Sequence, residues 1–296
     1  MKIGFIGLGA MGKGMAGALM HAGHSVSGYD VNPAALEWLR GRGGTPAASA
    51  AQACADADAV ILMTVNAAQA ETALFGPEGA VAGLRPGALV LSSVTMAAAD
   101  AERLGGRVTD AGLLFLDAPV SGGVGGAESG QLTIMASGSE AAFDVATLLL
   151  DAMSKRVFRC GDAPGAGSTM KMVHQLAAGA NIAVGAEAMS LGAHLGLDPA
   201  TLLELLNASA GGSWMIANRG PRMMTEGDEV TSAVDIFVKD LGIVLDAARA
   251  AKFPVPVAAS ALQVFLGASS AGFGAKDDSQ AVRFYEALGG KPVRKP

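Results

Sequence analysis

Three glycines, Gly7, Gly9 and Gly12, follow directly on an apolar run at residues 2–6 and precede a helical stretch. This order constrains the fold more than any other feature of the chain. In a strand–turn–helix of this spacing, the first glycine permits a tight turn, the second lets the backbone approach a pyrophosphate, and the third lets helix and strand pack closely. The first N–H groups of the helix then face the anion. We therefore predict a dinucleotide-binding turn that comprises Gly7, Leu8, Gly9, Ala10, Met11 and Gly12.

An acidic residue, Asp30, ends the second apolar run of the chain. About 20 residues after such a turn, a carboxylate can accept hydrogen bonds from the adenosine ribose. The charge of Asp30 would repel a 2′-phosphate, and the three residues that follow it include no arginine to pair with one. This pattern favours NAD over NADP as the cofactor. Asp30 also fits the role of a turn residue before Asn32 and Pro33, which would leave the choice of cofactor open.

Short apolar runs alternate with helical stretches through the first half of the chain. Strands, several of them bounded by Gly, Pro, Asn or Asp, are predicted at Lys2–Ile6, Ser25–Tyr29, Ala59–Val65, Ala88–Val94, Leu113–Pro119, Leu132–Ala136 and Arg156–Cys160. Helices between them are predicted at Met11–His21, Pro33–Gly41 and Ala97–Gly105. The central strands are apolar throughout, as expected where both faces of a sheet are buried. The alternation indicates a doubly wound, largely parallel sheet of the Rossmann type.

The pattern changes at the Gly- and Pro-rich segment 161–165, and no convincing strand follows it. A long helix is predicted over Ser168–Leu195. Further helices, each opened by a cap-like Asp, Ser or Pro, are predicted at Pro199–Ala208, Ser232–Lys252, Val257–Ser269 and Ser279–Leu288. The predicted fold class is α/β, with an N-terminal Rossmann domain at residues 1–164. A long helix joins it to a C-terminal all-α domain at residues 165–296, which we expect to serve substrate binding and oligomerisation.

Charge and cysteine content exclude several classes of protein. Lys and Arg number 21 against 27 Asp and Glu, a net charge of −6, which argues against a nucleic-acid partner. The two cysteines, Cys54 and Cys160, are too few and too far apart for a disulfide framework or a zinc-thiolate site, and no His, Asp and Glu cluster has the spacing of metal ligands. The apolar run Leu176–Ala193 contains Asn181 and Glu187, so we interpret it as a buried helix and not as a membrane span. With no signal peptide predicted either, we expect a cytoplasmic protein.

A glycine-rich stretch at residues 117–123 stands at the predicted end of a strand, where α/β sheets bind ligands. The Ser121 hydroxyl and the successive backbone N–H groups of Ser121, Gly122 and Gly123 could hold a carboxylate. An ordinary glycine turn has the same spacing and is the alternative.

Lys171, His174 and Gln175 lie at positions i, i+3 and i+4 of the predicted long helix, so they share one face. A lysine in so apolar a helix is a candidate acid–base group, although a lone lysine is more often a solvated charge. His174 is either a substrate ligand or a histidine satisfied by a neighbouring backbone carbonyl. Lys239 and Asp240 form a charged pair in another apolar helix, for which a surface salt bridge is the alternative.

Motifs at residues 4–12, 117–123, 165–171 and 239–241 follow one another in an order that covers nearly the whole chain. In this combination the sequence resembles the β-hydroxyacid dehydrogenase family, which includes 3-hydroxyisobutyrate and tartronate semialdehyde enzymes. The resemblance implies hydride transfer between NAD and a small hydroxy acid, with Lys171 as the catalytic acid–base and no metal ion. It also implies a homodimer or homotetramer. By the same resemblance Ser121, Gly122 and Gly123 cradle the substrate carboxylate, and Val65, Thr95 and Lys239 match cofactor-contacting positions.

One departure from the family pattern concerns the position three residues after the lysine, which is usually Asn and here is His174. With residues 65–69, 213–215 and 232–241, it resembles the subgroup of L-threonate dehydrogenases. That resemblance implies oxidation of a four-carbon sugar acid to its 2-oxo acid, with His174 and Gln175 at the substrate. A 3-hydroxyisobutyrate or tartronate semialdehyde type of dehydrogenase or reductase is the alternative within the family. A non-catalytic dinucleotide-binding module and an imine reductase are alternatives outside it, and Lys171 argues against both.

Overall fold

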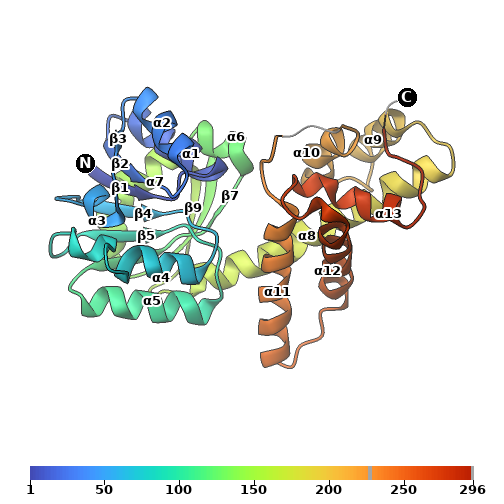
Figure 1. Ribbon diagram of the computed structural model, residues 1–296. Helices are drawn as coiled ribbons and strands as arrows, with labels where there is room; N and C mark the ends of the chain where they lie inside the picture. The colour runs from blue at the N-terminus through green and yellow to red at the C-terminus, as the bar shows by residue number, and fades with distance from the viewer. Residues whose placement is uncertain (226–228, 295–296) are drawn as a thin grey trace. The chain divides into compact units, whose positions relative to one another are not determined.

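The structure, a computed structural model, describes residues 1–225 and 229–294. The chain forms two compact units, Met1–Lys171 and Met172–Pro296. Helix α8, Ala166–His194, begins in the first unit and continues through the start of the second (Figure 1). The predicted domain division between residues 164 and 165 stays a prediction.

The first unit is built on one sheet, whose strands are β1 Lys2–Ile6, β2 Ser25–Tyr29, β3 Thr45–Pro46, β4 Ala59–Leu62, β5 Leu89–Ser92, β6 Leu114–Asp117, β7 Val120–Ser121, β8 Leu132–Ser137 and β9 Ser154–Gly161. The strand order is β3-β2-β1-β4-β5-β6-β8-β7, with β9 beside β8. Neighbours from β3 to β6 are parallel, whereas β8 is antiparallel to β6 and β7 and parallel to β9. The order reverses between β1 and β4, and ligands bind at the carboxyl ends of strands at such a reversal. The predicted Rossmann fold is confirmed.

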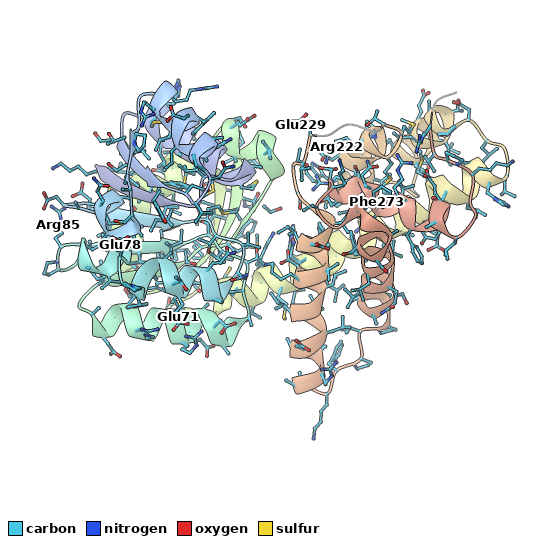
Figure 2. All side chains as sticks on the ribbon, viewed as in Figure 1. Glu71, Glu78, Arg85, Arg222, Glu229 and Phe273 are labelled. Carbon is cyan, nitrogen blue, oxygen red and sulfur yellow. The ribbon has the colours of Figure 1, made fainter. Side chains whose placement is uncertain are left out.

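The helices that accompany this sheet are α1 Ala10–His21, α2 Pro33–Gly41, α3 Ala50–Ala53, α4 Ala67–Phe75, η1 Ala80–Ala82, α5 Ala98–Asp110, α6 Gly123–Glu128 and α7 Glu140–Met153. On the solvent side, Glu71 of α4, labelled in Figure 2, forms ion pairs with Arg103 and Arg107 of α5. Such exposed pairs contribute about 1 kcal/mol or less each. Packing against the sheet therefore holds these helices more than their charges do.

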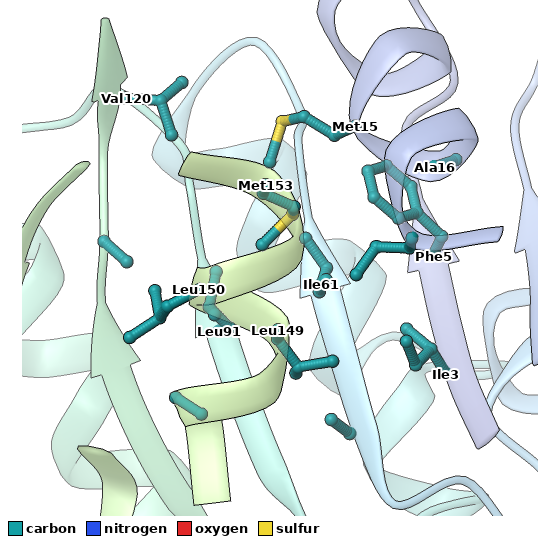
Figure 3. Close-up of a cluster of buried hydrophobic side chains, with 14 of the residues drawn as sticks. Ile3, Phe5, Met15, Ala16, Ile61, Leu91, Val120, Leu149, Leu150 and Met153 are labelled. Carbon is teal, nitrogen blue, oxygen red and sulfur yellow. The ribbon is translucent and has the colours of Figure 1, made fainter. Parts of the chain in front are cut away.

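The central strands are apolar on both faces because helices cover both sides of the sheet. In β4, Ile61 belongs to the buried cluster under α1 and α7, while Val60 and Leu62 belong to the cluster under α4 and α5. Figure 3 shows Ile61 beside Phe5 of β1 in the first of these clusters, to which Met15 of α1 also belongs. Burying one such side chain contributes about 1.5–3 kcal/mol, so this double-sided packing supplies most of the stability of the unit.

The described part of the second unit consists of helices and contains no strand, apart from an isolated bridge between Ala233 and Asp277. Besides α8, its helices are α9 Pro199–Ala208, α10 Trp214–Met223, α11 Val234–Ala250, α12 Pro256–Ala268, η2 Ser269–Phe273, η3 Asp278–Val282 and α13 Arg283–Ala287. Its core places Ile182 of α8 in one buried cluster with Phe237 of α11 and Phe265 of α12, whose rings stack at 5.0 Å between centroids. A Cβ on Gly179 would lie 3.0 Å from Leu241, so α8 and α11 pack closely at this glycine.

Within the described part of the chain, two helical segments, α8 and Pro256–Phe273, are long and apolar enough to cross a membrane by length and composition alone. In α8 more than half of the apolar window is buried inside the structure. Its hydropathy is therefore that of a core helix, as the sequence predicts for Leu176–Ala193.

The strands predicted from the sequence are all present, with ends shifted by a few residues. Strands β3 and β7 are not predicted, because two residues are too few to show an alternating pattern. Among the helices, α3, α4, α6 and α7 of the first unit and α10 of the second are not predicted either, and α10 contains Pro221, a residue that normally interrupts helices. The single helix predicted over Ser279–Leu288 is wrong in detail, because a 3-10 segment, η3, precedes α13 there.

Two arginines of α10 hold the chain segment that leads into η3. Arg219 donates two hydrogen bonds to the buried carboxylate of Asp278, at 2.8 and 2.9 Å. Arg222, labelled in Figure 2, donates to Asp277 at 3.0 Å, and Thr231 donates its N–H and its hydroxyl to the same carboxylate. Burial raises the pKa of Asp277, but hydrogen bonds from its amide, hydroxyl and guanidinium partners outweigh that effect and lower it to about 2.

This lowered pKa makes the second unit sensitive to acid. A carboxyl whose pKa is lower in the folded state than its unfolded value of about 3.9 stabilises the fold above that pH, and the stabilisation is lost as the pH falls toward 2. We expect Asp277→Asn to lower the free energy of unfolding at pH 7 by about 1–3 kcal/mol and to flatten its decline between pH 4 and pH 2. Circular dichroism during acid and urea unfolding measures both effects. Asp246→Asn, which breaks an exposed pair with Arg249, is the matched control and should leave both unchanged.

Candidate active site

The glycines of the turn between β1 and α1 are required for two different reasons. Gly7 has φ +94°, and a Cβ there would lie 2.5 Å from the Met63 carbonyl oxygen. A Cβ on Gly12 would lie 1.9 Å from the carbonyl oxygen of Gly7. A Cβ on Gly9, by contrast, meets no atom within 4 Å. The fold therefore requires Gly7 and Gly12, whereas the open space at Gly9 fits the close approach of a ligand.

Helix α1 begins at Ala10 with no side chain capping its N-terminus and no acidic residue in its first turn. The Leu8 N–H donates to Asp30 Oδ2 at 2.6 Å, and the Asn32 N–H donates to Asp30 Oδ1 at 2.8 Å. Asp30 thus ties the glycine turn to the end of β2. The uncapped helix end, with its positive dipole, suits a pyrophosphate, so the residues present fit a dinucleotide.

The carboxyl ends of β4 and β5 contribute further candidate cofactor contacts. Val65 is about half exposed, and its N–H donates to the Gln69 side chain at 3.0 Å in the cap of α4. Thr95 lies half-buried in the segment after β5. Just before it, the hydroxyl oxygens of Ser92 and Ser93 are buried and have no hydrogen-bond partner among the described residues. These two serines are not among the predicted site residues, although hydroxyl residues at the end of a buried strand are a signal for a ligand.

Asp117, at the end of β6, is fully buried and caps the start of α8. Its Oδ2 accepts hydrogen bonds from the N–H groups of Gly165 (3.0 Å) and Ser168 (2.8 Å), and its Oδ1 accepts from the Ser168 hydroxyl (2.8 Å). Burial raises the pKa of Asp117, and the hydrogen bonds from Ser168 and Gly165 oppose that rise. From its place at a strand end, Asp117 is predicted to lie in a ligand-binding stretch, whereas in the structure its carboxylate holds the start of a helix.

The first turn of α8 lies directly against the sheet. A Cβ on Gly167 would come within 2.5 Å of the Met135 carbonyl oxygen, and the Gly167 N–H donates to Ser137 Oγ at 2.9 Å. This close contact explains the glycine-rich start of the helix. Lys171 follows one turn later and is buried, with 7% of its surface exposed.

Ser121, Gly122 and Gly123 connect β7 to α6. Ser121 pairs with Thr133 of β8, and Gly122 and Gly123 adopt φ values of +134° and +66°. Helix α6 packs on α1, where a Cβ on Gly14 would lie 2.7 Å from the Cβ of Ala127. The predicted carboxylate cradle is therefore carried by a helix that packs on the helix of the dinucleotide turn.

His174 and Gln175 lie in the second unit, where Gln175 contacts α11. His174 Nδ1 is 3.0 Å from Gln175 Oε1, and Gln175 Nε2 donates to Asp240 Oδ2 at 2.5 Å. Lys239 Nζ lies 2.7 Å from the other oxygen of Asp240. The alternative of a surface salt bridge at Lys239 and Asp240 is thus partly wrong, because the two groups do pair but the Asp240 carboxylate is buried.

Each unit thus brings together part of the predicted site. The first contains the glycine turn, Asp30, Val65, Thr95, the cradle and Lys171, and the second contains His174, Gln175 and Lys239. Lys171 and His174 are one turn apart on the same continuous helix. Among the described residues, no group of three or more His, Cys, Asp or Glu side chains is arranged to hold a metal ion.

Two protein-family models match the chain. Residues 2–161 match a family model described as the NAD binding domain of 6-phosphogluconate dehydrogenase, and residues 165–285 match one described as NAD-binding of NADP-dependent 3-hydroxyisobutyrate dehydrogenase. The chain is therefore an oxidoreductase that uses a nicotinamide dinucleotide and acts on CH–OH donors.

Individual relatives define the family more closely. The chain is 48% identical to the L-threonate dehydrogenase of Cupriavidus necator over 97% of both chains, and 43% identical to that of Escherichia coli K12 over 97% of this chain and 95% of the other. A crystal structure of 3-hydroxyisobutyrate dehydrogenase from Salmonella typhimurium matches with a TM-score of 0.91 and 45% identity, over 95% of this chain and 98% of that one. The chain belongs to the β-hydroxyacid dehydrogenase family, and it is a dehydrogenase of small hydroxy acids.

The contrast between Gly9 and Gly12 predicts two separable phenotypes. Gly9→Ala should raise the KM for the dinucleotide at least tenfold while leaving the Tm of the free protein within about 1 °C, because the added methyl group meets only the ligand. Gly12→Ala should lower the Tm, because its methyl group would overlap the Gly7 carbonyl. Differential scanning fluorimetry and dinucleotide titration measure the two quantities. Equal losses of Tm in both variants would contradict this assignment.

Proposed function

We propose that this chain oxidises L-threonate to its 2-oxo acid with NAD as the hydride acceptor. The observation that carries the proposal is the buried Lys171 on α8, with His174 one helical turn further along the same helix. Relatives named L-threonate dehydrogenase share 43–48% identity with the chain over 97% of its length, which supports the choice of substrate.

In this proposal each part of the site has one task. The N–H groups of the cradle Ser121–Gly123 and the Ser121 hydroxyl bind the substrate carboxylate and so orient the carbinol carbon. Lys171, as the neutral amine, accepts the proton of the hydroxyl group that is oxidised, and it returns that proton in the reverse direction. The nicotinamide ring, when bound, supplies the acceptor for the hydride that leaves the same carbon. The dinucleotide is assigned to the remaining predicted residues, which are Gly7–Gly12, Asp30, Val65, Thr95 and Lys239.

Removal of the Lys171 amine tests the acid–base assignment. Lys171→Met should lower kcat by about 10²–10⁴, because a positioned acid–base group contributes that much, while dinucleotide affinity stays within about twofold. Lys171→Arg should not restore activity, since a guanidinium does not give up its proton near neutral pH. Steady-state kinetics and dinucleotide titration measure both effects. Turnover by the Met variant near the wild-type rate would rule out this role.

The Asp30 carboxylate predicts a preference for NAD. Its charge repels a 2′-phosphate, so kcat/KM should be higher with NAD than with NADP. Asp30→Asn removes the charge, so it should reduce the preference. It keeps only one of the two acceptor oxygens for the Leu8 and Asn32 amides, so the Tm should also fall. Steady-state kinetics with each cofactor measure the ratio of kcat/KM for NAD to kcat/KM for NADP. A wild-type preference for NADP would refute the role assigned to Asp30.

The proposed substrate is tested by competition between acids. L-Threonate should be oxidised with a kcat/KM at least tenfold above that for 3-hydroxyisobutyrate or D-glycerate, which corresponds to about 1.4 kcal/mol in transition-state binding. His174→Asn should reduce kcat/KM more for L-threonate than for the shorter acids. If 3-hydroxyisobutyrate or tartronate semialdehyde is instead the better substrate, the chain is an enzyme of that type within the same family.

A homodimer or homotetramer, assembled through the second unit, is part of the same proposal. Large apolar side chains are exposed along this unit, at Leu191, Leu195, Leu205, Val257 and Leu288. A monomer would leave these side chains in water, and an interface with a second copy would bury them. A cytoplasmic location stays a prediction.

A further inference from the structure

The outer face of α8 in the second unit is apolar, although solvent reaches it. Apolar residues recur there at intervals of three and four, which places them on one face of a helix with 3.6 residues per turn. This face, the α8 stripe, consists of Ala177, Ala180, Val184, Ala188, Leu191 and Leu195. Val184, Leu191 and Leu195 are 54%, 58% and 70% exposed, and no residue of the stripe carries a charge.

The opposite face of α8 packs in the core of the unit. Ile182, Ala186 and Met189 belong to the buried cluster that also contains residues of α11 and α12. A helix with one face in a core usually presents polar residues on the face opposite, whereas a helix that is apolar all round is buried on every side. The composition of the α8 stripe is therefore that of a surface covered by a partner.

The charges near the stripe limit the kind of partner. Glu187 and Asn181 lie beside it on the same helix, and Glu187 accepts a hydrogen bond from the Tyr285 hydroxyl at 3.1 Å. A helix that lies on a membrane surface is rich in Lys and Arg along its polar face, and α8 has neither after Lys171. The chain has a net charge of −6, so two copies repel each other least where the facing surfaces carry no charge. A second copy of this chain therefore fits the stripe better than a lipid surface does.

Side-chain size along the stripe indicates how two copies meet. The stripe begins with two alanines and ends with two leucines. In an antiparallel pair of such helices, the leucines of one copy face the alanines of the other, so large side chains fill the space beside small ones. A parallel pair would instead place leucine against leucine at one end and leave alanine against alanine at the other. The antiparallel pairs are Ala177 with Leu195, Ala180 with Leu191, and Val184 with Ala188.

We propose that the α8 stripe packs antiparallel on the α8 stripe of a second copy, about a twofold axis midway between Val184 and Ala188. The proposal rests on the homo-oligomer proposed above and names the surface that forms it. Between residues 177 and 195 the stripe is about 27 Å long and about 10 Å wide, a face of roughly 300 Å². A stable interface buries about 800 Å² per copy. The stripe is therefore the centre of the interface, and other exposed apolar side chains of the unit, such as Leu205, complete it.

Charge substitutions test the surface. Val184→Lys places like charges on both sides of the axis, so it should halve the molar mass of the particle in multi-angle light scattering, and Ala188→Glu should do the same. Because Val184 faces Ala188 of the second copy, an equimolar mixture of these two variants should restore the wild-type mass. Leu148→Lys, at an exposed leucine of α7 in the first unit, is the control and should leave the mass unchanged.

Cysteine cross-linking tests the orientation of the two helices. A Cys160→Ser background leaves Cys54, which is buried. In this background the double variant Ala177→Cys/Leu195→Cys should form a disulfide-linked dimer on a non-reducing gel, whereas Leu195→Cys alone should not. The two positions are about 27 Å apart along one helix, so they cannot link within one copy. Equal cross-linking of Leu195→Cys alone would show parallel helices and overturn the proposal.

The outcomes separate this proposal from the homo-oligomer on which it rests. A wild-type oligomer that keeps its mass in both charge variants overturns the α8 interface and leaves the homo-oligomer standing. A wild-type monomer refutes both, and its flotation with phosphatidylcholine vesicles would assign the stripe to lipid instead. Because the stripe is exposed, the fold should survive these substitutions. If circular dichroism shows that Val184→Lys does not fold, the mass of Ala188→Glu decides.

Discussion

The placement of Lys171 depends on one buried carboxylate. Asp117 is at the end of a central strand and accepts hydrogen bonds from the first residues of α8, so it joins the sheet to the helix that carries Lys171. Hydrogen bonds to a charged group contribute about 1.5–3 kcal/mol each, and here they oppose the desolvation that raises the pKa of Asp117. Gly167 adds the close contact with the sheet. These contacts fix the position of Lys171, because it lies one turn further along the same helix, α8.

Much of the fold is predictable from the sequence because its signals are local. Glycine spacing, apolar runs and cap residues predict the turn at Gly7, the strands of the first unit and most helices of the second. Strand β7 and helix α10 escape prediction because one is too short for a pattern and the other contains Pro221. The predicted ligand stretch that begins at Asp117 shows a further limit, because a strand-end acid has the same local signature whether it binds a ligand or caps a helix.

The candidate site is less predictable than the fold, because its decisive contacts join residues far apart in the chain. Helical spacing places Lys171, His174 and Gln175 on one face, but nothing local connects Gln175 with Asp240, which is 65 residues away. The buried hydroxyls of Ser92 and Ser93 are likewise visible only when the surrounding strands are in place. Sequence patterns therefore indicate which residues are chemically competent, and tertiary contacts determine which partners those residues meet.

The capping of α8 by Asp117 also affects how the protein can be divided into fragments. A fragment that ends at residue 164 would retain the buried Asp117 carboxylate. It would lose the Gly165 and Ser168 amides that donate hydrogen bonds to that carboxylate. A buried carboxylate deprived of its donors is strongly destabilising. A version of the nucleotide-binding half made for separate study should therefore extend through the first turns of α8, and a tag or a protease site belongs beyond Lys171.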